Sequence, residues 1–106
     1  MIERLTYQLT APRAAAGTRR QAIVGVVASG NLEVLVERAL PPEICRLEIA
    51  TSVHGFGTVW EAVVTDFVAR RPTGGLRISI NDAGARPDTV ALRLAQAVRL
   101  ICTEDA

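Results

Sequence analysis

RLEIATSVHGFGTVWEAVVTDFVARRPTGGLRISI, residues 46–80, is the stretch of sequence that decides the fold. Its first part, 46–53, alternates apolar and polar residues, which is typical of a strand with one buried face. A break at 54–57 separates this strand from an amphipathic run that continues to about Arg71 and predicts a helix. The alternation returns at 76–80. A strand, a helix and a strand in this order can form a right-handed crossover, which would make the sheet mixed, while the order of its strands stays open.

The helix within this stretch has its own start signal. Thr58-Val59-Trp60-Glu61 matches a capping box, in which Thr58 and Glu61 satisfy each other's backbone donors at the first turn. Two rows of apolar residues at spacing i, i+4 and i+8 predict the buried face. They are Val59, Val63 and Phe67, and Trp60, Val64 and Val68.

Outward from this stretch, the sequence predicts three further strands and a second helix. Alternation predicts strands at 3–9 and 32–38. Residues 21–27, QAIVGVV, are nearly continuously apolar, as expected of a strand covered on both faces. The second helix is predicted from Pro87 to about Cys102. Its buried residues would be Val90, Leu94, Val98 and Ile101, and its exposed residues Thr89, Arg93, Gln96 and Arg99.

The predicted order of elements is therefore β-β-β-β-α-β-α. Two helices with one apolar stripe each can cover a sheet with one apolar face, so an α+β two-layer sandwich is the simplest architecture. Its five-stranded sheet would be mostly antiparallel, and mixed where the crossover joins two strands. A chain of 106 residues is expected to form a single domain, residues 1–106.

Composition excludes several classes of function. The formal net charge is +1 and aromatic residues make up 4% of the chain, so the basic field and stacking platforms of a nucleic-acid binder are missing. Without an apolar stretch long enough to span a bilayer, or a signal-peptide pattern, the sequence predicts a cytoplasmic protein with no membrane partner. Cys45 and Cys102 are predicted to be small buried apolar residues, with a disulfide left open, and their spacing fits no zinc site.

Ser29-Gly30 lies between two apolar runs, residues 24–28 and 31–35. If these runs are adjacent antiparallel strands, Ser29-Gly30 is the two-residue turn of a hairpin, because glycine tolerates a positive φ there. The ordinary interpretation of such a pair is turn chemistry alone. A serine at this place also presents its hydroxyl to any partner that approaches the end of the hairpin.

The segment VASGNLEVL, residues 27–35, resembles the attachment segment of the acyl carrier (delta) subunit of malonate decarboxylase, in which a Gly-Ser-Gly-Asp pattern precedes Leu-Glu-Val-Leu. The resemblance covers nearly the whole chain. Ala28 and Asn31 depart from it, since they stand where the family usually has glycine and aspartate. Other matching parts are Thr51-Ser52-Val53, the Asn81-Asp82 turn with Gly84-Ala85 and Pro87, and Val90-Ala91-Leu92-Arg93-Leu94.

This resemblance implies that Ser29 carries 2′-(5″-phosphoribosyl)-3′-dephospho-coenzyme A through a phosphodiester. The thiol of that group would hold acetyl and malonyl thioesters for a malonyl transferase and for decarboxylase subunits, after a prosthetic-group transferase has loaded the chain. Ser29 is then a tether, and the chain is a carrier without catalytic residues or a metal. The phosphates of the arm suggest Arg13, Arg19 or Arg20 as partners.

Two other functions fit parts of the sequence. A hydrolase would pair Ser29 with His54, although no nucleophile-elbow pattern surrounds the serine. A small nucleotide-binding module would use the turn Gly55–Gly57, where backbone donors before a helix can take a phosphate, with Asp82 at the end of the next strand. Trp60 at the third glycine position of the dinucleotide fingerprint, and the short chain, count against this second alternative.

Overall fold

The computed structural model describes residues 2–25, 32–85 and 87–103. In these residues the elements follow the predicted order and confirm the α+β class. They are β1 (Glu3–Thr10), β2 (Gln21–Val24), β3 (Leu32–Arg38), β4 (Ile44–Thr51), α2 (Gly57–Arg70), β5 (Leu76–Asp82) and α3 (Pro87–Cys102).

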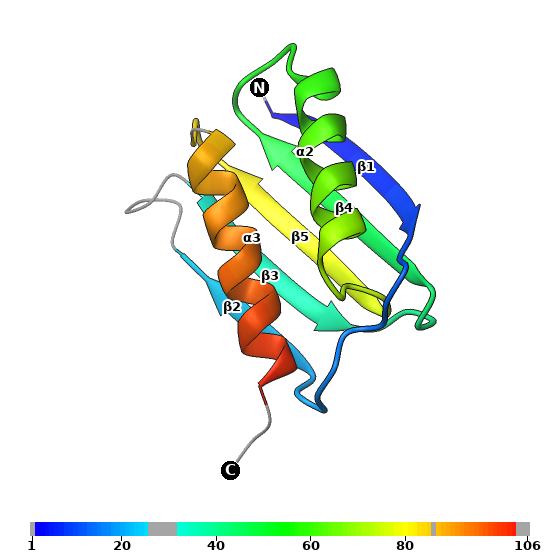
Figure 1. Cartoon of the computed structure of the whole chain (residues 1–106). Helices are drawn as coiled ribbons and strands as arrows, with labels where there is room; N and C mark the ends of the chain where they lie inside the picture. The colour runs from blue at the N-terminus through cyan, green and yellow to red at the C-terminus, as the bar shows by residue number, and fades with distance from the viewer. Residues whose placement is uncertain (1, 26–31, 86, 104–106) are drawn as a thin grey trace.

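The five strands form one mixed sheet in the order β1-β4-β5-β3-β2 (Figure 1). Neighbouring strands are antiparallel except β4 and β5, which run parallel with Leu47 opposite Ile78. The strand-helix-strand stretch therefore forms parallel neighbours, as its sequence allows. This pair occupies the second and third positions of the sheet, so the N-terminal strand and the β3–β2 pair flank it on opposite sides.

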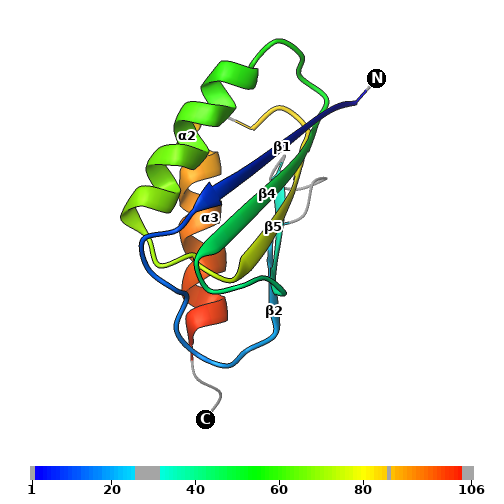
Figure 2. The same cartoon turned by 90° about the vertical axis from the view of Figure 1, so that its right-hand side faces the viewer.

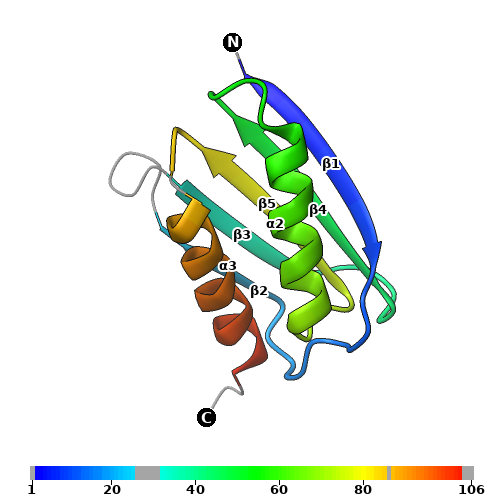
Figure 3. The ribbon, with the colours of Figure 1, turned by 45° about the horizontal axis from the view of Figure 1, so that its top comes forward.

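Both helices pack on one face of the sheet, which makes the molecule a two-layer sandwich (Figure 2). In Figure 3, α3 lies over β3 and β2, whereas α2 lies on the side of β4 and β1. The core between the layers takes alternate residues of the central strands and the inner faces of the helices. Its fully buried side chains include Leu32, Val34, Val36, Leu47, Ile78, Ile80, Val64, Leu94 and Ile101.

The prediction for residues 21–27 is wrong in two respects. The described strand ends at Val24, because Gly25 has a φ of +80° that takes it out of the ladder, and residues 26–27 lie outside the described residues. In addition, β2 is an edge strand, so only one of its faces is covered: Ala22 is buried while Ile23 is 58% exposed. A run of β-branched residues does not distinguish a strand buried on both faces from an edge strand under one helix.

The predicted capping box is also wrong. Helix α2 begins at Gly57, one residue before Thr58, and its N-cap is Phe56, which makes no side-chain capping hydrogen bond. Thr58 therefore lies inside the first turn, where it cannot act as the N-cap. The helix ends at Arg70, and the N–H of the extended Arg71 donates to the carbonyl of Phe67.

Exposure departs from prediction on both helices. On α2, Trp60 and Phe67 are buried as predicted, but Val59 is 43% exposed. On α3, Thr89, Arg93 and Gln96 are half-buried although exposure was predicted, since their helix rests across two strands and its flanks are partly covered. The four predicted core residues of α3 are buried, and Arg99 is exposed.

Both cysteines are free thiols, which decides the question of a disulfide. Cys45 is buried as predicted, and Cys102 is half-buried. Burial raises the pKa of the Cys45 thiol from 9.0 to about 11, against a smaller lowering by the Thr73 side chain. Within the described ranges, neither helix is long and apolar enough to cross a membrane. The same residues form no group of His, Cys, Asp and Glu side chains that could hold a metal ion.

Arg38, the last residue of β3, cross-links this end of the strand to neighbouring segments. Its guanidinium donates to four backbone carbonyls, which belong to Arg19 (3.1 Å), Ala15 (2.9 Å), Ala16 (2.8 Å) and Ile101 (3.0 Å). One side chain thus ties the loop before β2 to the last turn of α3. We call this part of the molecule the Arg38 end of the sheet.

Candidate functional site

Ser29, the predicted attachment residue, lies outside the described residues, and so does the predicted two-residue turn Ser29-Gly30. Ala28 and Asn31 fall in the same segment, 26–31. The structure does describe the two residues between which this segment runs, Gly25 and Leu32. These residues, together with their neighbours, define what we call the Leu32 end of the sheet.

The strands on either side of Ser29 are antiparallel neighbours, as predicted, but Val24 is the only residue of the run 24–28 that the described strand contains. The register pairs Gln21 with Glu37 and Val24 with Val34, whereas a two-residue turn at Ser29-Gly30 would pair Val24 with Leu35. Ser29 is therefore five residues along the chain from each member of the last described pair.

Gly25 allows the two strands to approach closely at this point. A Cβ on this residue would lie 2.4 Å from the carbonyl oxygen of Leu32, and the φ of +80° is one that side-chain-bearing residues rarely adopt. Position 25 therefore requires glycine for two reasons: the Leu32 carbonyl leaves no room for a Cβ, and the backbone has a positive φ. The sequence pattern indicated a turn role for Gly30 but did not indicate this role of Gly25.

The missing side chain of Gly25 leaves room for Arg93 of α3. A Cβ on Gly25 would lie 3.0 Å from Nη1 of Arg93 and 3.2 Å from its Cδ. Arg93 is half-buried here, beside the start of the segment that contains Ser29. A half-buried arginine beside a glycine of positive φ has no local sequence signal, because the contact joins residues 68 positions apart.

Asp82 joins the Leu32 end to the turn before α3. It pairs with Leu32 in the sheet and is buried. One carboxylate oxygen accepts from the Thr51 hydroxyl at 2.8 Å, and the other accepts from the backbone N–H groups of Gly84 (3.2 Å) and Ala85 (2.8 Å). The carboxylate therefore fixes the β5–α3 turn. Thr51, its partner, was not identified from the sequence.

An apolar pocket of about 410 Å³ opens at the same end, between the first turns of the two helices. Phe56 (48% exposed), Val59 and Val53 (36% exposed) expose much of their apolar surface there, while Trp60 is buried. The alternation at 46–53 and the helical spacing predicted burial of Val53 and Val59, but β4 ends at Thr51, so that Val53 lies past the strand, and Val59 is 43% exposed. The remaining lining residues are Val63, Asp82, Gly84, Ala85 and Val90.

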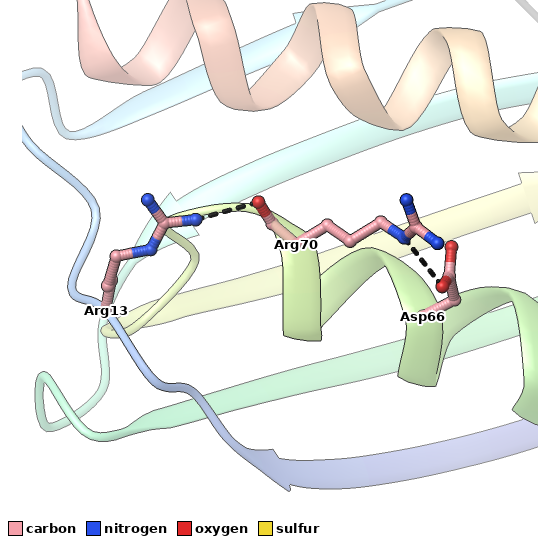
Figure 4. Close-up of polar contacts among 3 residues, drawn as sticks. All are labelled: Arg13, Asp66 and Arg70. Atoms are coloured by element: carbon pink, nitrogen blue, oxygen red, sulfur yellow. Dashed lines mark hydrogen bonds and ion pairs between the residues drawn. The ribbon is translucent and has the colours of Figure 1, made fainter.

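The arginines suggested as phosphate partners lie at the other end of the molecule. Arg13 donates to the carbonyl of Arg70 at 2.8 Å, near the last turn of α2 and beside the Arg70–Asp66 ion pair (Figure 4). The carbonyls of Arg19 and Arg20 accept hydrogen bonds from Arg38. These contacts place all three arginines toward the Arg38 end, away from Leu32.

His54, the suggested partner of Ser29 in a hydrolase, is exposed in the loop between β4 and α2. In the sheet, β5 separates β4 from β3, the strand that follows Ser29. The neighbouring Gly55 has a φ of +88°, and its N–H donates to the Glu3 carboxylate at 3.4 Å. The Gly55–Gly57 turn therefore leads into α2 beside the apolar pocket.

Comparison with known proteins gives concordant results. Residues 19–101 match the family described as "Malonate decarboxylase delta subunit (MdcD)". The malonate decarboxylase acyl carrier protein of Bradyrhizobium diazoefficiens is 61% identical over 100 residues, which cover 94% of this chain and 95% of that relative. The protein of the same name from Xanthomonas euvesicatoria is 50% identical over 105 residues, covering 99% of this chain and all of the relative.

A solved structure is similar over nearly the same length. It is a chain of a Pseudomonas malonate decarboxylase hetero-tetramer, crystallised in complex with malonate. The TM-score is 0.80 at 34% sequence identity, and the match covers 93% of this chain and 98% of the other.

Proposed function

This chain belongs to the malonate decarboxylase delta-subunit family, and from this premise we propose that it is the acyl carrier subunit of a malonate decarboxylase and works as a single domain. In this proposal Ser29 is the residue that carries the prosthetic group. The chain itself performs no catalytic step. The partners are the transferase and decarboxylase subunits of the complex, together with the transferase that loads the group, and the complex works in the cytoplasm.

The proposal rests chiefly on the pairing of β2 with β3. Along the chain, Ser29 is five residues from both Val24 and Val34, which pair with each other in the sheet. A tether needs reach and a rigid point of attachment, whereas a nucleophile needs a neighbouring proton acceptor. The pairing of β2 with β3, with the close approach of Gly25 to Leu32, supplies a rigid point of attachment.

The proposed group is 2′-(5″-phosphoribosyl)-3′-dephospho-coenzyme A, joined to the Ser29 oxygen by a phosphodiester. When bound, it supplies a thiol that holds acetyl or malonyl as a thioester. The residues around the Leu32 end fit such a group. Arg93 offers a cation beside Gly25, and an apolar pocket opens at the same end of the sheet.

Mass spectrometry tests the attachment directly. The chain has three serines, Ser29, Ser52 and Ser79. Each is changed to alanine and produced together with the decarboxylase subunits and the loading enzymes. We expect the intact mass of Ser52→Ala and Ser79→Ala to include the group, and that of Ser29→Ala to lack it. Peptide mapping that finds the group on another residue, or a functioning complex without a group on Ser29, contradicts the proposal.

A second candidate function, nucleotide binding, is favoured by the pocket beside the Gly55–Gly57 turn. Trp60 lines this pocket and is the only tryptophan of the chain, so its fluorescence reports on an occupant. Titration of the unmodified chain with ATP or NAD should give a saturable change that Val59→Glu abolishes, if this function is correct. No change up to millimolar nucleotide contradicts it and leaves the carrier function unaffected.

A further inference from the structure

We propose that the apolar pocket at the Leu32 end binds an uncharged acetyl thioester and excludes a malonyl thioester, which carries a carboxylate. This inference rests on the proposed function, since it takes acetyl and malonyl as the two acyl groups of the carrier. It adds a binding site for one of them, formed by described residues alone. The size of the pocket, its lining and the charge of Asp82 carry the inference.

The size and lining of the pocket suit a small apolar group. Its volume of about 410 Å³ falls within the range of ligand-binding pockets, roughly 300–1,000 Å³, which are lined mainly by hydrophobic and aromatic side chains. Phe56 and Trp60 contribute aromatic rings, and Val63 of α2 and Val90 of α3 place the pocket between the two helices. An acyl group that enters therefore exchanges water for apolar contacts, which is favourable.

The rim of the pocket is accessible from solvent. Val53, Phe56 and Val59 are large apolar residues that the fold leaves between 36% and 48% exposed, and all three line this one cavity. Exposed apolar residues that stand singly on a surface need no explanation, whereas a contiguous group of them around a hollow marks a binding site. The pocket is thus open to a ligand without any rearrangement of the core.

Asp82 determines which charge the ligand can have. Among the described residues that line the pocket, it is the only ionisable one, and it is buried. Its carboxylate accepts from the Thr51 hydroxyl and from the N–H groups of Gly84 and Ala85, and all three donors are neutral. A second carboxylate in the same pocket would lose its hydration and would be repelled by the first.

Acetyl and malonyl differ by one such carboxylate. An acetyl group ends in a methyl group, which the apolar lining favours, whereas a malonyl group ends in a carboxylate that is ionised at neutral pH. The pocket therefore distinguishes the two forms of the carrier. The acetyl thioester is shielded from water, and the malonyl thioester stays outside the pocket, where a partner subunit can act on it.

The fluorescence of Trp60, the only tryptophan, tests the inference on the unmodified chain. The chain is titrated with S-acetyl-pantetheine and with S-malonyl-pantetheine, two free thioesters that differ only in the carboxylate. We expect a saturable change with the acetyl thioester at millimolar concentration, and binding of the malonyl thioester that is at least about tenfold weaker. The absence of a saturable change with the acetyl thioester, or equal affinity for both, overturns the inference.

Val59→Asp and Leu92→Asp are matched variants. Both residues are exposed apolar residues of a helix, so neither change disturbs the core, but only Val59 lines the pocket. Val59→Asp should abolish the response to the acetyl thioester, and Leu92→Asp should retain it. An unchanged response in Val59→Asp overturns the inference.

Assembly with the decarboxylase subunits provides a second measurement. If Val59→Asp prevents assembly and the acetyl thioester gives no response in the wild-type chain, the pocket takes a side chain of a partner subunit, and the inference is overturned. The titrations use free thioesters and need no attached group. Intact mass of the loaded chain tests the attachment at Ser29 separately, so a failure here is distinguished from a failure of the proposed function.

Discussion

The two ends of the β2–β3 pair use arginine in opposite ways. At the Arg38 end, one guanidinium donates to four backbone carbonyls and ties a loop to the last turn of α3. At the Leu32 end, Arg93 is half-buried and lies against Gly25. One end is closed by internal hydrogen bonds, and the other holds a cation beside a glycine of positive φ, close to an apolar pocket. The same residue type thus distinguishes a cross-linked end from a more open one.

The largest effect is expected at the Arg38 end. Arg38→Ala removes four hydrogen bonds and leaves part-buried carbonyls, including that of Ile101, without a donor. We expect a loss of roughly 3 kcal/mol in the free energy of unfolding, measured with urea. Arg38→Lys should recover only part of it, because an ammonium cannot reproduce the planar fork.

Arg46 is the control for Arg38. It donates from Nε (3.0 Å) and Nη2 (2.8 Å) to the Gln8 side chain on the exposed face of the sheet. We expect Arg46→Ala to lower the free energy of unfolding by less than about 1 kcal/mol. Equal losses for Arg38→Ala and Arg46→Ala would remove the distinction between the two ends.

Gly25 sharpens the comparison from the other end. Gly25→Ala forces a Cβ to 2.4 Å from the Leu32 carbonyl oxygen in a backbone of positive φ. We expect it to destabilise the chain by about 2 kcal/mol and to lower loading of Ser29. Gly55 has a φ of +88°, and a Cβ added there would have no atom within 4 Å. Gly55→Ala therefore measures the loss of stability caused by the positive φ alone, about 1 kcal/mol. Equal stability of the two variants would show that the close approach is unimportant.

The hydrogen bond between Thr51 and Asp82 should have a smaller effect. Thr51→Val keeps the shape of the side chain and removes the 2.8 Å donor to a buried carboxylate. We expect a loss of about 1.5 kcal/mol, with Thr6→Val on an exposed position of β1 as the near-neutral control. Differential scanning calorimetry measures both. A neutral Thr51→Val would mean that the β5–α3 turn is held by its backbone donors alone.

Cys45 gives the smallest effect, at alkaline pH. Its pKa is raised from 9.0 to about 11 by burial, so above pH 9 the unfolded chain loses a proton that the folded chain keeps. The stabilisation is complete below pH 9 and falls as the pH rises toward 11, by at most about 1.4 kcal/mol per pH unit. Cys45→Val should abolish this part of the pH dependence between pH 8 and 10. Identical slopes for both proteins contradict the assignment.

The alternation in β3, β4 and β5 and the strand-helix-strand order were sufficient to predict the layers and to allow for the parallel pair, because both follow from local period and chain connection. The errors have local causes too. Ile23 belongs to an apolar run whose position at the edge is set by the other strands, and Thr58 was predicted as the N-cap two residues after the actual N-cap, Phe56. Val53 lies past the end of β4, and Val59 is exposed on the first turn of α2, which periodicity does not reveal.

Only the part of the site that belongs to a recognisable sequence motif was predicted. Ser29 was singled out because its segment resembles the attachment segment of the family, and the attachment at this residue stays a prediction. The roles of Gly25, Arg38 and Arg93 depend on contacts between distant parts of the chain, such as Arg38 with Ile101, and no spacing rule indicates them. The three arginines suggested from the sequence were chosen by charge alone, and their contacts lie toward the opposite end.

The shortness of β2 has a consequence for the reach of the group proposed to be attached at Ser29. This edge strand contributes four paired residues, against eight in β1 at the opposite edge, and it exposes Ile23 to solvent. Peeling it from β3 therefore uncovers little apolar surface, and amide exchange should find it among the first strands to open. If Ser29 is the attachment residue, as proposed, each residue released from β2 lengthens the chain that carries it, while β3, in the interior of the sheet, keeps the other side fixed.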